Sequence, residues 1–378
     1  MVRASLLGIV VLVATATATA AAPRQPALEE AALLSGSVLA LAPPAIPVVV
    51  PTPDEAFALD ADMHAFVAPL QAFRDPRRRM LALVQAMEAR GMFSLEYAEV
   101  TRTASSTFHD RQGNCLSFTM LFVTLARAVD LYASYRSVDV PPTWSYDGTV
   151  VVANHVNTAV RTGGGEETVV DFNIRPYSSD QRSRRVSDSY ALGLFYTNLG
   201  AEAILRSDYY AALVYLREAA GVFPDIAGIW VNLGVVYARH GQYEHAEAAY
   251  LRALEADYNE PSALTNLALV YTALGETELA DEYRERVQGY RERNPYYHFA
   301  LATRAYEEQQ FADALVQVRK ALRLKPDEHE FYTLRGEAQT ALGKEREASR
   351  SFELAREYAE AEQMRAQSRT AFGGLALR

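Results

Sequence analysis

The chain has 378 residues, of which 49% are hydrophobic and 22% are charged, as in an ordinary globular protein. Its formal net charge of −10 disfavours binding to nucleic acid and to anionic lipid, which both select basic surfaces. The short arginine-rich stretch at residues 74–79 is expected to be a solvated helix face. The composition therefore indicates an acidic, folded protein with no nucleic-acid partner.

The first residues have the layout of a secretory signal peptide over residues 1–22. Arg3 precedes an apolar run from Leu6 to Val13, and Ala-x-Ala triplets that could be cleaved follow it. That run is short for a membrane span, so we expect a periplasmic or secreted protein without stable membrane insertion after cleavage; an uncleaved anchor is the alternative. Residues 23–53 are proline-rich, and we expect a loosely ordered tether.

Residues 54–190 change from a helical pattern to an extended one. Helices followed by an antiparallel sheet form an α+β arrangement. The expected elements are helices over about 54–72 and about 76–90, a polar loop over 102–114, a buried helix from Cys115 to about Leu131, and strands over about 132–140, 149–161 and 167–173.

The chain contains a single cysteine, Cys115. In an oxidising compartment an unpaired cysteine indicates a reactive thiol or an intermolecular disulfide, and a small buried hydrophobic residue is the alternative. Asn114 is a good N-cap, so Cys115 is predicted in the first turn of the buried helix. There the helix dipole favours a thiolate, and unpaired N–H groups could hold an oxyanion.

A histidine and an aspartate follow on adjacent predicted strands. If the hairpin turns at Gly163, His155 lies opposite Asp171; if it turns one residue later, the two are diagonal neighbours. Both registers place the two side chains on one face of the sheet. The carboxylate would then orient the imidazole and leave its other nitrogen for the thiol.

This layout resembles the transglutaminase-like superfamily of cysteine enzymes, in which cysteine at a helix N-terminus is followed by histidine and aspartate on adjacent strands. The segments GNCLSFTMLFVTLARAVDLYASYRSV, ANHVNTAV and VVDFN carry the resemblance, over about residues 80–180. It implies a papain/transglutaminase-like α+β fold, with Cys115 as nucleophile, His155 as general acid/base and Asp171 as orienting carboxylate. Family members form a thioester from an amide and resolve it with water or an amine, and the motif does not choose between them.

Other polar residues are candidates for the same site. Gln112 or Trp144 could supply a further oxyanion donor. His109 competes as a base, although the sequence offers it no orienting partner. The remaining histidines show no metal-ligand grouping, and no nucleotide or phosphate fingerprint occurs, so neither a metal nor another cofactor is expected.

Residues 193–360 repeat with a period of 34 residues. The segment WVNLGVVYARHGQYEHAEAAYLRAL resembles the tetratricopeptide (TPR) repeat. Five copies are expected to stack as helix pairs into an all-α solenoid, with residues 361–378 as a C-terminal tail. The alanines that recur at the period are Ala212, Ala246, Ala280, Ala314 and Ala348.

Three asparagines at the same period, Asn198, Asn232 and Asn266, are predicted to stack on one face of the solenoid. A side-chain amide can pair with an extended backbone without reading its sequence, so a protein or peptide is expected along the concave face. Alternatively these residues reflect only the frequency of asparagine at this position of TPR sequences.

The features together favour an exported thiol hydrolase or acyltransferase that acts on amide bonds of peptides or proteins. In this hypothesis the repeats bind the substrate or a partner. The alternative is a non-enzymatic TPR adaptor with an inert first domain. A thiol that senses oxidation by forming an intermolecular disulfide is a third hypothesis.

Overall fold

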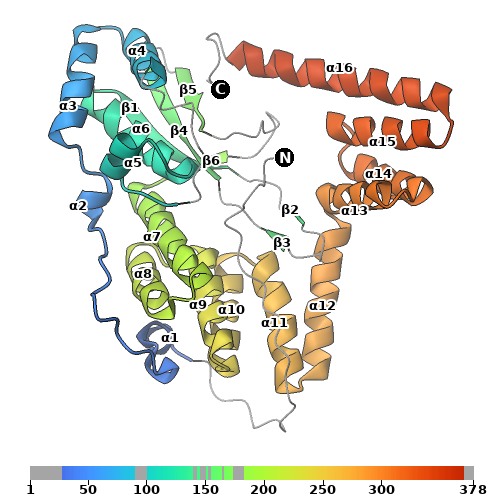
Figure 1. The fold of residues 1–378 in the computed structure, drawn as a ribbon, viewed down its shortest axis with the longest axis horizontal. Coiled ribbons are helices and arrows are strands. Elements are labelled where there is room, and N and C mark those ends of the chain that lie inside the picture. The colour runs from blue at the N-terminus through green and yellow to red at the C-terminus, as the bar shows by residue number, and fades with distance from the viewer. Residues whose placement is uncertain are drawn as a thin grey trace.

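The structure is a computed structural model in which residues 28–89, 100–138, 143–144, 150–151, 155–163, 166–172 and 183–369 are described. The predicted signal peptide, residues 1–22, lies outside the described residues. The chain is mostly helical, with a small antiparallel sheet in its first part and a helical solenoid in its second (Figure 1).

The first domain is built around one buried helix, α6 (Cys115–Ala128). Asn114 caps it as predicted, because its side chain accepts a hydrogen bond from the backbone N–H of Ser117. The predicted loop over 102–114 is wrong in part, since it contains α5, which Thr103 caps in the same way. The other helices are α2 (Pro53–Ala56), α3 (Ala61–Val67), the 3₁₀ segment η2 (Ala68–Ala72), α4 (Pro76–Ala89) and α5 (Ala104–Asp110).

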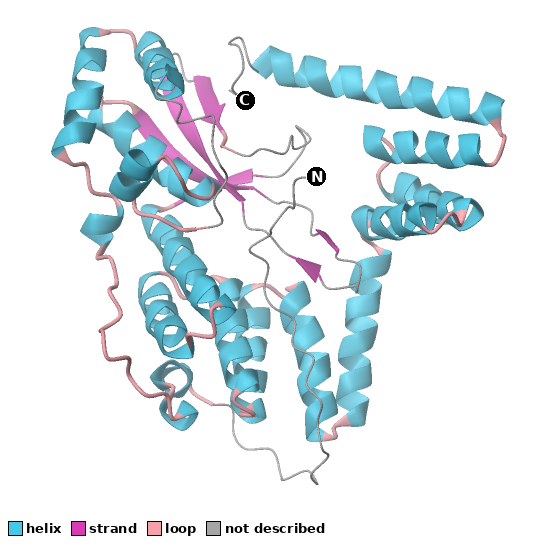
Figure 2. Ribbon diagram, viewed as in Figure 1, coloured by secondary structure: helices cyan, strands magenta, loops and turns pink. Residues whose placement is uncertain are grey.

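A four-stranded antiparallel sheet lies against this helix, with the strand order β5-β4-β1-β6. Helix α6 contacts β1 and β4, and α4 contacts β4 (Figure 2). The strand β6 was not predicted, because its sequence SRRV lacks apolar alternation and it pairs only along the edge. The strands are β1 (Tyr132–Val138), β4 (His155–Gly163), β5 (Glu166–Val170) and β6 (Ser183–Val186), with β2 (Thr143–Trp144) and β3 (Val150–Val151) as a separate pair.

The register of β4 and β5 decides between the two hairpins considered for the sequence. Thr158 pairs with Val170. Continuing this register places Asp171 opposite Asn157 and diagonal to His155. The paired residues therefore follow the second of the two registers up to Arg161, with an irregularity between Arg161 and Gly163. In this register both side chains are on one face of the sheet.

Ten helices form five antiparallel pairs that follow one another in an arc from α7 to α16 (Figure 1). The five periodic alanines are all buried, as expected where paired helices cross closely. Helix α16 extends into the predicted tail. The pairs are α7 (Asp188–Leu205) with α8 (Tyr209–Val222), α9 (Ala227–Arg239) with α10 (Tyr243–Ala256), α11 (Pro261–Leu274) with α12 (Thr277–Glu292), α13 (Pro295–Glu307) with α14 (Phe311–Leu324), and α15 (His329–Ala341) with α16 (Glu345–Arg369).

The predicted tether is instead an ordered strap, which we define as residues 28–52. It contains α1 (Glu30–Ser35) and η1 (Ser37–Leu39), and α1 contacts α8 and α10. Leu33 and Leu39 are buried. Side chains of the repeats bind backbone carbonyls of the strap, which lie either in the last turn of α1, where a helix leaves carbonyls unpaired, or in the proline-containing segment after it. These bonds run from Tyr196 to Pro51 (2.6 Å), from Tyr215 to Val49 (3.1 Å), from Tyr237 to Leu33, and from Arg217 to Leu34 and Ser35.

One hydrophobic core runs from the strap through the first domain to α12, whereas α13–α16 enclose a second one. The first domain and the first three repeats therefore share their buried surface. Among the described residues, no helix combines the length and the apolarity that a membrane span requires.

The helix pairs depend on close contact at Gly234 in α9. A Cβ there would lie 2.4 Å from the buried ring of Tyr250, so we expect Gly234→Ala to lower the free energy of unfolding by about 1–3 kcal/mol through overpacking. The matched control is Gly221→Ala in α8, where a Cβ meets nothing within 4 Å and the substitution should add roughly 0.5–1 kcal/mol. Urea unfolding of both variants measures this. Equal effects of the two substitutions would contradict the packing described.

Candidate active site

Cys115 is the first residue of α6 and remains partly exposed, whereas most of the helix is buried. One turn later, the hydroxyl of Thr119 lies 2.7 Å from the carbonyl oxygen of Cys115 and 3.0 Å from that of Val156. Val156 is the neighbour of His155 on β4. Thr119 therefore fixes the start of the helix beside the strand that carries the histidine.

His155 is hydrogen-bonded to both of the other predicted residues. Its Nε2 lies 2.8 Å from Oδ1 of Asp171, and its ring also bonds to the thiol of Cys115. Because Nε2 faces the carboxylate, Nδ1 is the nitrogen available to the sulfur. The side chains of His155 and Asp171 are only 2% and 5% exposed, so the pair is shielded from water, whereas Cys115 is partly exposed.

The surroundings of His155 favour its protonated form. Burial lowers the pKa of the imidazole, but the hydrogen bonds with Asp171 and Cys115 and the charges of both partners outweigh burial and raise the pKa to about 9. An imidazolium held between a carboxylate and a thiol is suited to exchange a proton with a sulfur nucleophile.

Asn157 is a further member of the site that the sequence analysis did not identify. Its Nδ2 donates to Oδ2 of Asp171 at 3.0 Å, so both carboxylate oxygens are held. Phe172, the next residue, contacts Phe118 and Phe122 of α6 with ring centroids 6.0 and 5.8 Å apart. The HVN spacing was the available signal, because alternate residues of a strand share a face.

The predicted oxyanion donors remain predictions. Gln112 is half-buried in the loop that precedes α6. Trp144 belongs to β2, and its side chain lies outside the described residues. The backbone N–H groups at the start of α6 are donors that the helix itself does not use.

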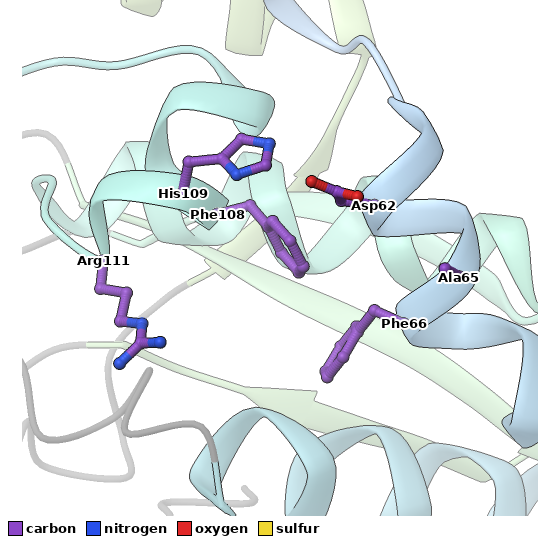
Figure 3. Close-up of a pocket in the computed structure, with 6 residues that line it drawn as sticks. All are labelled: Asp62, Ala65, Phe66, Phe108, His109 and Arg111. Carbon is purple, nitrogen blue, oxygen red and sulfur yellow. The ribbon is translucent and has the colours of Figure 1, made fainter.

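His109 lies on α5 and belongs to a separate cluster. Its Nε2 is 2.9 Å from Oδ2 of Asp60, an orienting partner that the sequence did not reveal. Burial raises the pKa of Asp60, but hydrogen bonds from Ser105, the backbone of Met63 and His109 lower it to about 2. His109 lines a cavity of about 400 Å³ with the rings of Phe66 and Phe108, flanked by Asp62 and Arg111 (Figure 3).

The three predicted asparagines lie on successive first helices of the repeats, α7, α9 and α11. Asn198 is half-buried and Asn232 is buried. Asn266 is 2% exposed, and neither its Oδ1 nor its Nδ2 has a hydrogen-bond partner among the described residues. A buried amide without partners costs free energy, so a ligand that supplied partners would be stabilised there. Across the described ranges, no three histidine, cysteine or acidic side chains gather as metal ligands.

The buried pair makes a pH-dependent prediction. The folded pKa of His155, about 9, exceeds its ordinary value of 6.5. Its contribution to stability is therefore fully present below about pH 6.5 and is lost as the pH rises through about 9. Asp171→Asn should lower the pKa of His155 and flatten the dependence of the unfolding free energy on pH in that range.

NMR titration of the imidazole and denaturation at several pH values measure both effects. Asp60→Asn, which alters the other His–Asp pair of this domain, is the matched control and should leave His155 unchanged. An unaltered His155 titration in Asp171→Asn would contradict the pairing.

Comparison with known proteins supports the repeats. Residues 227–260, the second copy, match the tetratricopeptide repeat family. The chain is 24% identical over 186 residues to Superkiller protein 3 of Schizosaccharomyces pombe, covering 47% of this chain and 13% of that protein. It is 28% identical over 118 residues to the Photosystem I assembly protein Ycf3 of a Synechococcus species, covering 31% of this chain and 65% of that protein.

Two solved structures that resemble part of the chain have low TM-scores. The structure of MamA residues 41–end from Desulfovibrio magneticus matches 45% of this chain and 96% of its own, with 20% identity and a TM-score of 0.25. YrrB, described as a TPR protein with an unusual peptide-binding site, matches 47% of this chain and 92% of its own, with 18% identity and a TM-score of 0.26. The family match and the repeating helix pairs together mean that this chain contains tetratricopeptide repeats.

Proposed function

We propose that the protein is a thiol hydrolase or acyltransferase that acts on amide bonds of a peptide or protein, and that its TPR repeats bind that substrate or a partner. The observation that carries the proposal is the hydrogen-bonded series from Cys115 through His155 to Asp171. A transglutaminase-like first domain is part of the proposal, supported by the chain order of the three residues and by their positions on α6 and next to each other at β4 and β5.

The geometry supports a two-step acyl transfer. The proton that Cys115 and His155 share is on His155, so the sulfur attacks the amide carbon as a thiolate; the C–N bond then breaks as His155 gives that proton to the departing amine. The product is a thioester. Water or a second amine resolves it by giving a proton to His155 as it attacks, and the sulfur leaves as a thiolate, so that an acid or a new amide is released and the starting pair is restored.

The three residues differ in their exposure to water and in their roles. The carboxylate of Asp171, held by Asn157, stabilises the imidazolium without being exposed to water. The N–H groups at the start of α6 are near the sulfur and suit a developing oxyanion, with Gln112 and Trp144 as candidate additional donors. Water is the default acceptor, because it is abundant in the periplasm. We place this chemistry in the periplasm or outside the cell, on the basis of the predicted signal peptide.

A non-catalytic TPR adaptor is the second candidate function. The comparisons favour it, because residues 227–260 match the TPR family and one relative is named as an assembly protein. Asn198, Asn232 and Asn266 would then bind an extended partner, and the first domain would contribute only structure. The two candidates differ in whether the thiol of Cys115 is coupled to His155.

Alkylation of the thiol tests the enzyme directly, without knowledge of the substrate. We expect the thiol of Cys115 to react with iodoacetamide on the order of tenfold faster in the unaltered protein than in the His155→Ala variant near neutral pH, because the imidazole accepts the thiol proton. Intact-protein mass spectrometry gives the rates. Cys115→Ala should not be labelled and should keep its fold.

The matched control is His109→Ala, which removes the histidine of the separate Asp60 cluster and should alkylate like the unaltered protein. Equal rates for His155→Ala and the unaltered protein would refute the coupling and leave the adaptor as the better proposal.

The three periodic asparagines, Asn198, Asn232 and Asn266, can be tested by a substitution that should weaken peptide binding without lowering the stability of the fold. Asn266→Leu replaces a buried, unpaired amide with a side chain of similar size, so we expect stability to be unchanged or higher by about 1 kcal/mol. Enrichment of phage-displayed peptides by the repeats should fall. Asn259→Ala, at an exposed site before the same repeat, is the control. Unchanged peptide enrichment in Asn266→Leu would count against a ladder that binds backbone.

A further inference from the structure

A carboxylate is buried in the first repeat at a position that is apolar in its neighbours. Glu202 on α7 is 7% exposed, and the residues 34 and 68 positions later are Val236 and Val270, both buried. Burying a carboxylate is costly unless specific partners hold it. The repeat architecture does not require an acid here, so its partners must account for it.

Those partners belong to the first domain. The backbone N–H of Thr101 donates to Oε1 of Glu202 at 2.7 Å, and the Thr101 side chain also bonds to this carboxylate. Burial raises the pKa of Glu202, and the bonds from Thr101 oppose that rise. Glu202 therefore fixes residue 101, which precedes α5 and lies outside the repeats.

From Thr101 the hydrogen bonds continue to the helix that carries the thiol. Nδ2 of Asn114 donates to Oγ1 of Thr101 at 2.7 Å, and Oδ1 of Asn114 accepts from the N–H of Ser117 at 2.9 Å. The Ser117 hydroxyl donates to the same oxygen at 3.0 Å and accepts from the N–H of Arg102 at 2.9 Å. The N-cap of α6 is thus held by a buried series of hydrogen bonds that begins at Glu202 in the repeats.

The other end of α6 is tied to the same repeat helix. Arg127, in the last turn of α6, forms two hydrogen bonds of 2.6 and 2.9 Å with Asp188, the first residue of α7. The two helices are therefore joined at both ends. At the end where Cys115 begins the helix, the bonds run through buried groups, which water does not screen.

We propose that Glu202 is a positioning residue for Cys115, through which the first TPR repeat sets the geometry between the thiol and His155. This inference rests on the proposed thiol chemistry. Its physical basis is that a displacement of about 1 Å between reacting groups can cost on the order of a hundredfold in rate. Motion of α7 when a partner binds the repeats would reach the thiol by the same chain.

Substitutions along this series of hydrogen bonds distinguish a positioning role of Glu202 from a contribution to stability alone. Thr101→Val removes the hydroxyl at nearly constant volume, and Glu202→Leu makes this position apolar, as it is in the next two repeats. Asn114→Ser keeps an N-cap residue but cannot reach Thr101. The matched control is Glu218→Gln, an exposed acid on α8 of the same repeat.

The measurement is the rate of Cys115 alkylation by iodoacetamide from about pH 5 to about pH 9, together with the NMR titration of His155. We expect folded Thr101→Val and Glu202→Leu to lose on the order of tenfold in alkylation rate near neutral pH and to show a displaced His155 titration, with Glu218→Gln unchanged. If Glu202→Leu does not fold, Thr101→Val and Asn114→Ser give the same result.

Two results would overturn the inference. Suppose that Thr101→Val, Glu202→Leu and Asn114→Ser fold and are alkylated at the rate of the unaltered protein, while His155→Ala is alkylated slowly. Glu202 then has no positioning role, and the proposed thiol chemistry stands. If His155→Ala itself alkylates at the unaltered rate, the thiol chemistry fails and the inference fails with it. Lower thermal stability with an unaltered pH profile counts as the first of these results.

Discussion

The central constraint of this structure is a buried imidazole shared between a carboxylate and a thiol. A charge at His155 is tolerated only because Asp171 lies 2.8 Å away and is itself held by Asn157. The surrounding contacts serve this arrangement: Thr119 ties the start of α6 to β4, and Phe172 packs the end of the carboxylate strand on the same helix. Cys115, the one partly exposed residue of the three, is where the series comes nearest to solvent.

The same helix is also the point at which the two halves of the molecule meet. The first domain shares its hydrophobic core with the first three repeats, and the strap contacts α8 and α10 through α1 before it enters the first domain at α2 (Figure 1). A partner bound along these repeats would be held at a fixed place relative to the thiol. The last two repeats have their own core, so they are less directly coupled to the site.

Periodic and local features were predictable from the sequence, whereas long-range ones were not. The spacing of 34 residues predicted the repeats, and Asn114 predicted where α6 begins, because both signals lie within a short window. The hairpin register was narrowed to two choices, and the pairing of Thr158 with Val170 selects one. The order of the strap was not predicted, because the side chains that bind it, such as Tyr237 and Arg217, are distant in sequence. The pairing of Glu202 with Thr101 could not be predicted for the same reason, because the two residues are distant in sequence.

Acylation of Cys115 by a small activated ester, p-nitrophenyl acetate, tests the coupling of the thiol to His155 without knowledge of the natural substrate. We expect a burst of p-nitrophenol equal to the amount of protein, an acetyl group on Cys115 by mass spectrometry, and its release by water at a rate that His155→Ala lowers by about a hundredfold or more. An acetyl group that forms and is released equally fast in His155→Ala, or no acetylation of Cys115, would show that the thiol is not coupled to His155.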